Sequence, residues 1–373
     1  MQVVNKGLVF KGRAGTLEAS NCFPSVAALS DGRILVAFRS AAVKNSPVTR
    51  VAVTASKDDG RTWSDPVAPA EDTAWDGTPG NFHCMNISEV APGRVLGVLL
   101  WVDRRRPELP FFNPETEGLL PCKNLLYESR DGGGSWTFLC AADTTPFAGQ
   151  PTTTGPVLSV SPGTLAAFYE TNKDYDDPRP WRHQAVVKFS RDGGRTWPEH
   201  AVVAADPAGR CFYWDQRPVV LRANTLLAFL WTYDRTAKKD VPIHWTRSDD
   251  GGRSWTAPQS TGITGQIAYP AALADGRVLL AYVDRYATAS IRVRMSLDEG
   301  RSWEPDELVL WPGAEERAAR QNHGDGMGQY LQSMQQWSFG LPCTAMMSGG
   351  DVFIAYYAGD PKVQSIHWAR VRP

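Results

Sequence analysis

The chain has 373 residues, a formal net charge of −1 and a pI near 6.6, enough sequence for two average domains or one large all-β unit. The balanced charge and the lack of a basic run argue against a nucleic-acid partner. The longest apolar stretch, about Val95–Val102, is far too short to span a bilayer, so we expect no membrane association.

The N-terminal residues MQVVNKGLVFKGR lack the apolar core and cleavage site of a signal peptide. We therefore expect a cytoplasmic protein, or a secreted one if a leader has been lost. The six cysteines show no CxxC spacing, which favours free thiols in a chain of this length. No cofactor or metal ion is implied, and the oligomeric state stays open.

A pair of apolar strands joined by a short turn recurs along the chain, and a third strand follows each pair. The runs of Val, Leu and Ala are typical of strands buried on both faces. Six segments have this pattern: Phe23–Phe38, Asn86–Trp101, Gly155–Tyr169, Pro218–Trp231, Tyr269–Tyr282 and Pro342–Tyr357.

Five copies of Ser-x-Asp-x-Gly-x-(Thr/Ser)-Trp follow the third strands. In such a turn the Asp accepts backbone N–H bonds, the Gly supplies a positive φ and the Trp is a large apolar plate to bury. The copies are Ser56–Trp63, Ser129–Trp136, Ser190–Trp197, Ser248–Trp255 and Ser296–Trp303. Five copies in one chain predict a repeat architecture.

This motif resembles the Asp-box repeat of sialidases and related β-propellers. The resemblance implies an all-β fold, a six-bladed β-propeller of four-stranded antiparallel blades forming a single domain over residues 1–373. We expect the N-terminal segment, about Val3–Lys11, to be the outer strand of blade six and to close the ring, which removes exposed strand edges. In the family the boxes lie far from the active site.

Three insertions interrupt the repeats: Asp103–Lys123, Thr171–His183 and Trp311–Trp337. We expect a short helix around Ala314–Gln321 in the third. Long loops on a rigid scaffold usually carry function, and the aromatic residues of the first two suggest lids over a pocket.

The first strand of each blade starts, and the second ends, at the same face near the axis, so a ring of aromatic and acidic residues is expected there. Paired carboxylates suit glycosidic cleavage. We expect Glu170 and Asp215 to be the catalytic pair, with Asp215 as nucleophile or base and Glu170 as the acid. Asp234 and Asp284 are reserve candidates. The expected partner is an oligosaccharide or polysaccharide, bound by side chains from the same ring: Arg39, Trp101, Arg104, Trp214, Arg217, Trp231, Tyr233, Arg235, Gln266, Arg285 and Trp337.

The match to sialidases fails at most of their catalytic positions. Their Arg-Ile-Pro motif corresponds to Cys22-Phe23-Pro24, the region of their acid/base Asp reads AFRSAAVKNSP, and the place of their nucleophilic Tyr falls near Leu341. The position of their Glu falls on Asp215. The resemblance therefore implies a sialidase-like glycoside hydrolase that is not a conventional sialidase.

Two alternatives remain. A polysaccharide lyase acting on uronates would use His83 as base together with a Tyr such as Tyr213 or Tyr233, and Arg104 or Arg217 to neutralise the carboxylate. A non-catalytic glycan-binding propeller would use its tryptophans as stacking platforms.

Overall fold

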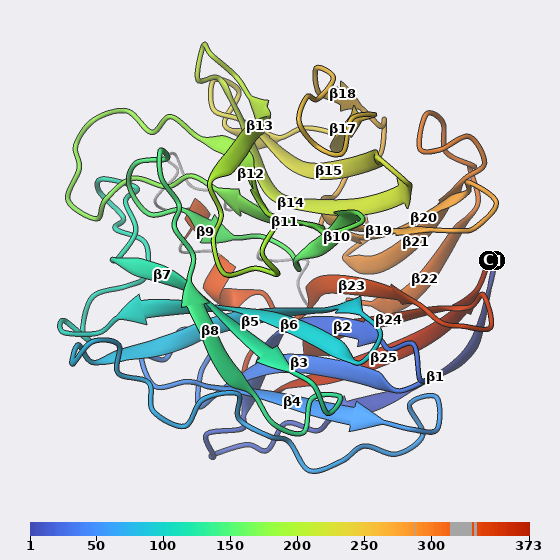
Figure 1. Cartoon of the computed structure of the whole chain (residues 1–373), viewed down its shortest axis with the longest axis horizontal. Coiled ribbons are helices and arrows are strands. Elements are labelled where there is room, and N and C mark those ends of the chain that lie inside the picture. Colours follow the sequence, from blue (N-terminus) through green and yellow to red (C-terminus); the bar gives the residue numbers. More distant parts are fainter. Residues whose placement is uncertain (287, 314–329, 332–333) are drawn as a thin grey trace.

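We analysed a computed structural model of the chain, which describes residues 1–286, 288–313, 330–331 and 334–373. The fold is an all-β propeller, in which antiparallel sheets are arranged around a common centre (Figure 1). No helix in these ranges is long and apolar enough to cross a membrane. The helix expected around Ala314–Gln321 lies outside the described residues.

Four sheets each form one blade. The first contains β5 (Gly80–Ala91), β6 (Arg94–Asp103), β7 (Cys122–Ser129) and β8 (Thr137–Ala141). The second contains β10 (Leu158–Ser161), β11 (Thr164–Glu170), β12 (Gln184–Ser190) and β13 (Glu199–Ala205), with β9 (Thr152–Thr153) paired to β11. The third contains β14 (Cys211–Arg222), β15 (Thr225–Asp234), β17 (His244–Ser248) and β18 (Gln259–Ser260), with β16 (Lys239–Asp240) paired to β15. The fourth contains β19 (Gln266–Ala272), β20 (Val278–Asp284), β21 (Ser290–Ser296) and β22 (Glu307–Pro312).

The fifth sheet has seven strands and joins the two ends of the chain. It contains β2 (Ser20–Ala28), β3 (Ile34–Ala41) and β4 (Arg50–Ser56), and also β23 (Gly340–Met346), β24 (Val352–Gly359) and β25 (Gln364–Arg372). Only one parallel pair, Ser20 with Gln364, links the two halves. The segment β1 (Gln2–Phe10) pairs antiparallel with β25, which is the pairing expected for the N-terminal strand, and the two termini lie side by side in Figure 1.

The strand pairs expected from the apolar runs are all present. The first repeat differs at its outer edge, where one bridge, Val53 with Val67, occupies the place of a fourth strand. The short 3-10 helix η2 (Met334–Gln336) precedes β23.

The Asp-boxes form the turns after the third strands. In the box of Ser190–Trp197, Ser190 Oγ donates to Asp192 Oδ1 at 2.8 Å and accepts from the Gly194 N–H at 2.8 Å. Asp192 also accepts from the Thr196 N–H at 2.9 Å. The Ser–Asp and Gly–Ser bonds recur in all five boxes, so each box is a self-contained hydrogen-bonded turn.

The core lies between neighbouring blades rather than along the axis. Box tryptophans supply part of it by packing edge-on against the second strand of the preceding blade: Trp255 meets Phe168 with ring centroids 6.5 Å apart, and Trp303 meets Phe229 at 5.8 Å. Partial burial of such large rings stabilises the packing between blades.

A bulge interrupts the pairing of the first and second strands in five of the blades. The register shifts at Phe23, His83, Asp215, Ile267 and Leu341. Four of these residues have positive φ: Phe23 at 54°, Asp215 at 46°, Ile267 at 38° and Leu341 at 47°. Positive φ is uncommon for bulky residues and clusters at functional sites, and bulges re-aim side chains.

Candidate functional site

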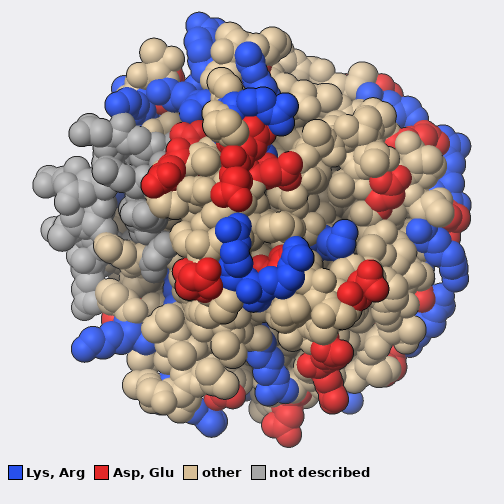
Figure 2. Space-filling model, turned by 90° about the vertical axis from the view of Figure 1, so that its left-hand side faces the viewer, with Lys and Arg blue, Asp and Glu red and all other residues tan. Residues whose placement is uncertain are grey.

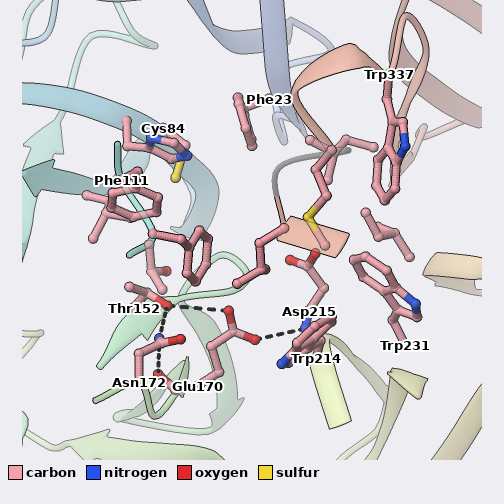
Figure 3. A pocket seen from close by; sticks show the side chains of 18 of the residues that line it. Phe23, Cys84, Phe111, Thr152, Glu170, Asn172, Trp214, Asp215, Trp231 and Trp337 are labelled. Atoms are coloured by element: carbon pink, nitrogen blue, oxygen red, sulfur yellow. Dashed lines mark hydrogen bonds between the residues drawn. The ribbon is translucent and has the colours of Figure 1, made fainter. Parts of the chain in front are cut away.

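The five bulge residues all line one pocket. This pocket has a volume of about 220 Å³ and is lined by residues from every blade and from the segment before β23. Figure 3 shows Glu170, Asn172, Thr152 and Asp215 on one side, with Phe23 and Trp337 across from them. The bulges therefore orient these five side chains toward the pocket.

Glu170 and Asp215 are brought together in this pocket. Glu170 ends β11, and its Oε2 accepts a hydrogen bond of 3.0 Å from the backbone N–H of Asp215 (Figure 3). This contact uses the backbone of Asp215, because the positive φ turns its side chain away toward the pocket.

Asp215 forms an ion pair with Arg217. Oδ1 of Asp215 lies 2.8 Å from Nη2 of Arg217, which follows two residues later on β14. Burial raises the pKa of Asp215 to about 6, against the lowering effect of Arg217 and with a smaller raising effect from Glu170. Asp215 therefore holds a proton over part of the range near neutral pH.

Glu170 is supported by polar neighbours. Oε1 accepts from the Thr152 hydroxyl at 3.5 Å, and Oε2 lies 3.6 Å from Nε2 of the buried His183. Asn172 donates to Thr152 Oγ1 at 3.0 Å. The Thr152 hydroxyl thus donates to the Glu170 carboxylate, and Asn172 donates to that hydroxyl in turn.

His83, on β5, lines the pocket. Its ring stacks on Phe111 at 4.4 Å, and its Nδ1 is 3.2 Å from Nη1 of Arg39. Because a guanidinium only donates, Nδ1 accepts and Nε2 carries the ring proton. Burial, with the charges of Arg39, Arg104 and Lys44, holds the pKa of His83 well below its ordinary value. His83 is thus a neutral hydrogen-bond donor.

Arg39 itself lies behind His83 rather than on the pocket wall. It is 2% exposed, packs over Phe23 and also donates to the Lys44 carbonyl. Within the described ranges the guanidinium has no carboxylate partner. Burial lowers the pKa of Arg39.

Asp240, a half-buried carboxylate outside the pocket lining, holds part of the pocket wall. Asp240 Oδ1 accepts from Trp231 Nε1 at 2.9 Å, and Oδ2 accepts from Tyr330 Oη at 2.6 Å and from Gln266 Nε2 at 2.8 Å. Burial raises the pKa of Asp240 despite these bonds. The network ties Trp231, a pocket residue, to the segment before β23.

The expected site residues divide into two groups. Those that line the pocket are Glu170, Asp215, His83, Trp214, Arg217, Trp231, Arg285 and Trp337. Those that lie outside its lining are Arg39, Trp101, Arg104, Tyr213, Tyr233, Asp234, Arg235, Gln266 and Asp284.

The second group has visible structural partners. Trp101 Nε1 donates to the Thr73 carbonyl at 2.8 Å, and Arg104 bonds Asn81 at 3.1 Å. Arg235 pairs with Glu117 at 3.0 Å. Asp234 accepts from backbone N–H groups of its own turn, and so does Asp284.

Tyr213 and Tyr233 also lie outside the pocket lining. Tyr213 contacts the His244 ring, with centroids 6.1 Å apart, and Tyr233 stacks on Trp214 at 5.8 Å. Gln266 and Tyr233 therefore act behind the pocket wall.

Sequence reasoning missed several residues. Lys44, Thr152, Asn172 and Met334 line the pocket, and His183 and Asp240 support it. Leu341, the position that the sequence analysis matched to the sialidase Tyr, also lines the pocket. Lys44, His183 and Asp240 lie on loops or a two-residue strand, where no periodic pattern signals them.

Comparisons with known proteins agree with this fold. The family model described as BNR repeat-like domain matches residues 109–354, more than half of the chain. No curated protein gave a sequence match.

Solved structures resemble the chain over its whole length. A protein of unknown function from Dyadobacter fermentans is 20% identical, with a TM-score of 0.74 over 100% of this chain and 99% of that one. The intramolecular trans-sialidase from Ruminococcus gnavus, solved with oseltamivir carboxylate, is 13% identical, with a TM-score of 0.67 over 98% and 96% of the two chains. The α-L-arabinanase of Penicillium chrysogenum, solved with arabinobiose, is 14% identical, with a TM-score of 0.67 over 100% and 98%. At such identities the likeness concerns the fold alone, and by its family match the chain belongs to the BNR repeat-like domain family, with a β-propeller fold similar to that of sialidases and trans-sialidases.

Proposed function

We propose that the protein is a glycoside hydrolase that cleaves a glycan in the pocket containing Glu170 and Asp215. The observation that carries the proposal is this pair of carboxylates, joined through the Asp215 backbone N–H and lying in one pocket with Trp214 and Trp231. Paired carboxylates are the usual machinery of glycosidic cleavage, and aromatic side chains suit sugar rings. Proteins of similar fold bind sugars, as the arabinobiose complex illustrates.

The two carboxylates take distinct roles in this proposal. Protonated Asp215, with its pKa raised to about 6, donates its proton to the glycosidic oxygen as the carbon–oxygen bond breaks. Glu170 acts as the base and takes a proton from the water that adds to the anomeric carbon. These roles are the reverse of those expected from the sequence, because the raised pKa belongs to Asp215.

The proposal includes the architecture that frames the site. We take residues 1–373 as one six-bladed domain, in which β2–β4 is the first blade and β23–β25 with β1 is the sixth. The single Ser20–Gln364 pair that merges these blades into one sheet, and the β1–β25 ladder, support closure by the N-terminal strand.

Elimination fits the contacts less well than hydrolysis. A lyase base must accept a proton, whereas His83 presents Nε2–H, its Nδ1 is occupied by Arg39, and Tyr213 lies outside the pocket lining. Figure 2 shows Lys and Arg side chains interspersed with Asp and Glu side chains on one face of the molecule.

The test is product analysis on a glycan panel with Glu170→Gln and Asp215→Asn. Each variant should lower turnover by about 10²- to 10⁴-fold, while Glu304→Gln and Asp65→Asn, at exposed positions, should match the wild type. New reducing ends without an ultraviolet-absorbing unsaturated uronate support hydrolysis. Full activity of both pocket variants contradicts the assignment, and binding without turnover by the wild type favours a glycan-binding protein.

A further inference from the structure

The bulge residues divide the pocket into two chemically different halves. Phe23, Ile267 and Leu341 come from β2, β19 and β23, and all three are apolar. Leu341 packs against both neighbouring core clusters, one of which also holds Phe23 and the other Ile267. The three bulges therefore form one continuous apolar surface.

The segment before β23 extends this surface. Leu331, Met334 and Trp337 line the pocket and pack in the same cluster as Ile267. We call the six residues Phe23, Ile267, Leu331, Met334, Trp337 and Leu341 the apolar wall. Phe23, Met334 and Leu341 keep part of their surface exposed. Apolar surface that faces water in a concave site favours an apolar ligand group.

The opposite half carries the polar groups. Thr152, Glu170, Asn172 and Asp215 lie together across the pocket from Phe23 and Trp337 (Figure 3). Trp231 lies beside them. A sugar placed with its hydroxyls and scissile bond on the polar half would turn its remaining substituents toward the apolar wall.

The basic side chains of the pocket direct donors at protein acceptors. Lys44 Nζ donates to the carbonyls of Met334 at 2.8 Å and Trp337 at 3.0 Å and to Tyr357 Oη at 2.9 Å. These three bonds use the three protons of an ammonium group.

The two arginines are engaged in a similar way. Arg217 pairs with Asp215. Arg285 donates to Gln266 at 2.9 Å and to the Phe339 carbonyl at 2.5 Å, with its guanidinium 4.0 Å from the Trp337 ring centroid. A ligand carboxylate would have to compete with these contacts, because bidentate pairing needs a guanidinium edge that is available.

We propose that the pocket recognises a neutral sugar carrying an apolar group, with that group packed on the apolar wall. The inference rests on the proposed function, whose substrate class it names. The apolar group is either a methyl on the sugar itself, as in a 6-deoxy sugar, or an aglycone joined through the scissile oxygen. Either source offers the same surface to Phe23, Met334 and Leu341.

The expected preference follows from the area removed from water. Burial of one methyl group contributes about a fourfold gain in affinity, and a phenyl group about tenfold or more. A carboxylate in place of that group should lose affinity, since it would be desolvated against the apolar wall.

The experiment measures binding without turnover, using full-length Glu170→Gln protein and ligand-observed NMR titration. One arm compares galactose, 6-deoxygalactose and galacturonic acid, each as the D and the L enantiomer. The same comparison is made with the available sugars of the gluco, manno and arabino series. A second arm compares methyl and phenyl glycosides of the same sugars. The first arm reports a methyl on the sugar, and the second reports an aglycone.

Two substitutions in the Glu170→Gln background locate the effect. Leu341→Asn removes the apolar side chain at a positive φ that Asn adopts readily, and Met334→Gln changes polarity at nearly constant shape. Each should reduce the apolar preference to about twofold or less. Leu297→Asn, the same change at a side chain that is 60% exposed on a box, should leave it unchanged.

The outcomes separate cleanly. The proposal is supported if, in either arm, the ligand with the apolar group binds more tightly and both pocket variants reduce this preference. This result would support it even if the wild type turns over no glycan and the hydrolase proposal fails. Equal binding with and without the apolar group, tighter binding of the uronate, no binding by any member, or an effect of Leu297→Asn equal to that of the pocket variants overturns it.

Discussion

Arg217 Nη2 donates to Asp215 Oδ1 at 2.8 Å, two residues along the same strand. The proposed acid, Asp215, therefore forms its ion pair with a residue of the same strand, β14. Arg217 lowers the pKa of Asp215, whereas burial raises it to about 6.

The pH dependence of turnover should report this pair. An acid works while protonated, so kcat/KM of the wild type should fall as pH rises through about 6. Arg217→Met removes the lowering effect, and the falling limb should move to higher pH. Rate profiles of both proteins from pH 4 to 9 measure the shift. Arg222→Met, an exposed change at the far end of β14, serves as control, and a limb that stays in place or moves to lower pH contradicts the assignment.

The tautomer of His83 gives a second prediction. Nitrogen-detected NMR of the wild type should show a neutral ring protonated on Nε2. Arg39→Met removes both the donor to Nδ1 and a positive charge that lowers the His83 pKa, so that pKa should rise while burial keeps it below 6.5. Arg61→Met, on an exposed box residue, should change nothing. Protonation on Nδ1 in the wild type would refute the assigned hydrogen bond.

The boxes should stabilise the fold in a pH-dependent way. Burial raises the pKa of Asp250, but hydrogen bonds from Ser254 and Ser248 outweigh it and lower that pKa to about 2. The stabilisation is therefore present above about pH 4 and is lost as pH falls through 2. Asp250→Asn should lower the free energy of unfolding by about 1–2 kcal/mol at pH 7, with solvent screening limiting the effect, and by less at pH 2.5. Urea unfolding at the two pH values measures this free energy, with Asp65→Asn, at an exposed position, as the control. An equal loss of stability at both pH values would contradict the role of the ionised Asp250 carboxylate.

The N-terminal strand offers a test of ring closure. A Cβ on Gly7 would lie 2.9 Å from Nε1 of Trp368 on β25, so Gly7→Val should push the two strands apart and lower the free energy of unfolding by about 1–3 kcal/mol. Lys6→Val, at an exposed position on the same strand, is the matched control. Thermal unfolding distinguishes the two, and equal stability of both variants would mean that β1 contributes little to the ring.

The sequence predicted the strands well because their signals are local. The box residues fix the turns, and the apolar runs fix the buried pairs. The pairing of β1 with β25 was also accessible, since an apolar N-terminal segment needed a partner and the last repeat had room for one.

The site was only partly accessible from sequence. Glu170 and Asp215 follow from counting along strands, but the φ of 46° at Asp215 does not, and this backbone geometry decides that its N–H rather than its carboxylate meets Glu170. Trp101 and Tyr213 lie at the strand positions expected for site residues, but their side chains do not line the pocket. Successive side chains point to opposite faces of a strand, and counting along the sequence does not show which face is the pocket side. Lys44 and Asp240 reach the site through tertiary contacts between distant segments, which no local pattern encodes.

The β1–β25 ladder has a consequence for biosynthesis. β1 pairs with β25, which follows all the other described strands in the sequence, so β1 stays unpaired while the intervening blades are translated. Blades built from neighbouring strands can form during synthesis, whereas the final seam closes only after translation of β25 and requires a loop as long as the ring itself. Closure of the ring should therefore be a late and slow step of folding, before which β1 and the edge of β25 are exposed to chaperones and to misassociation.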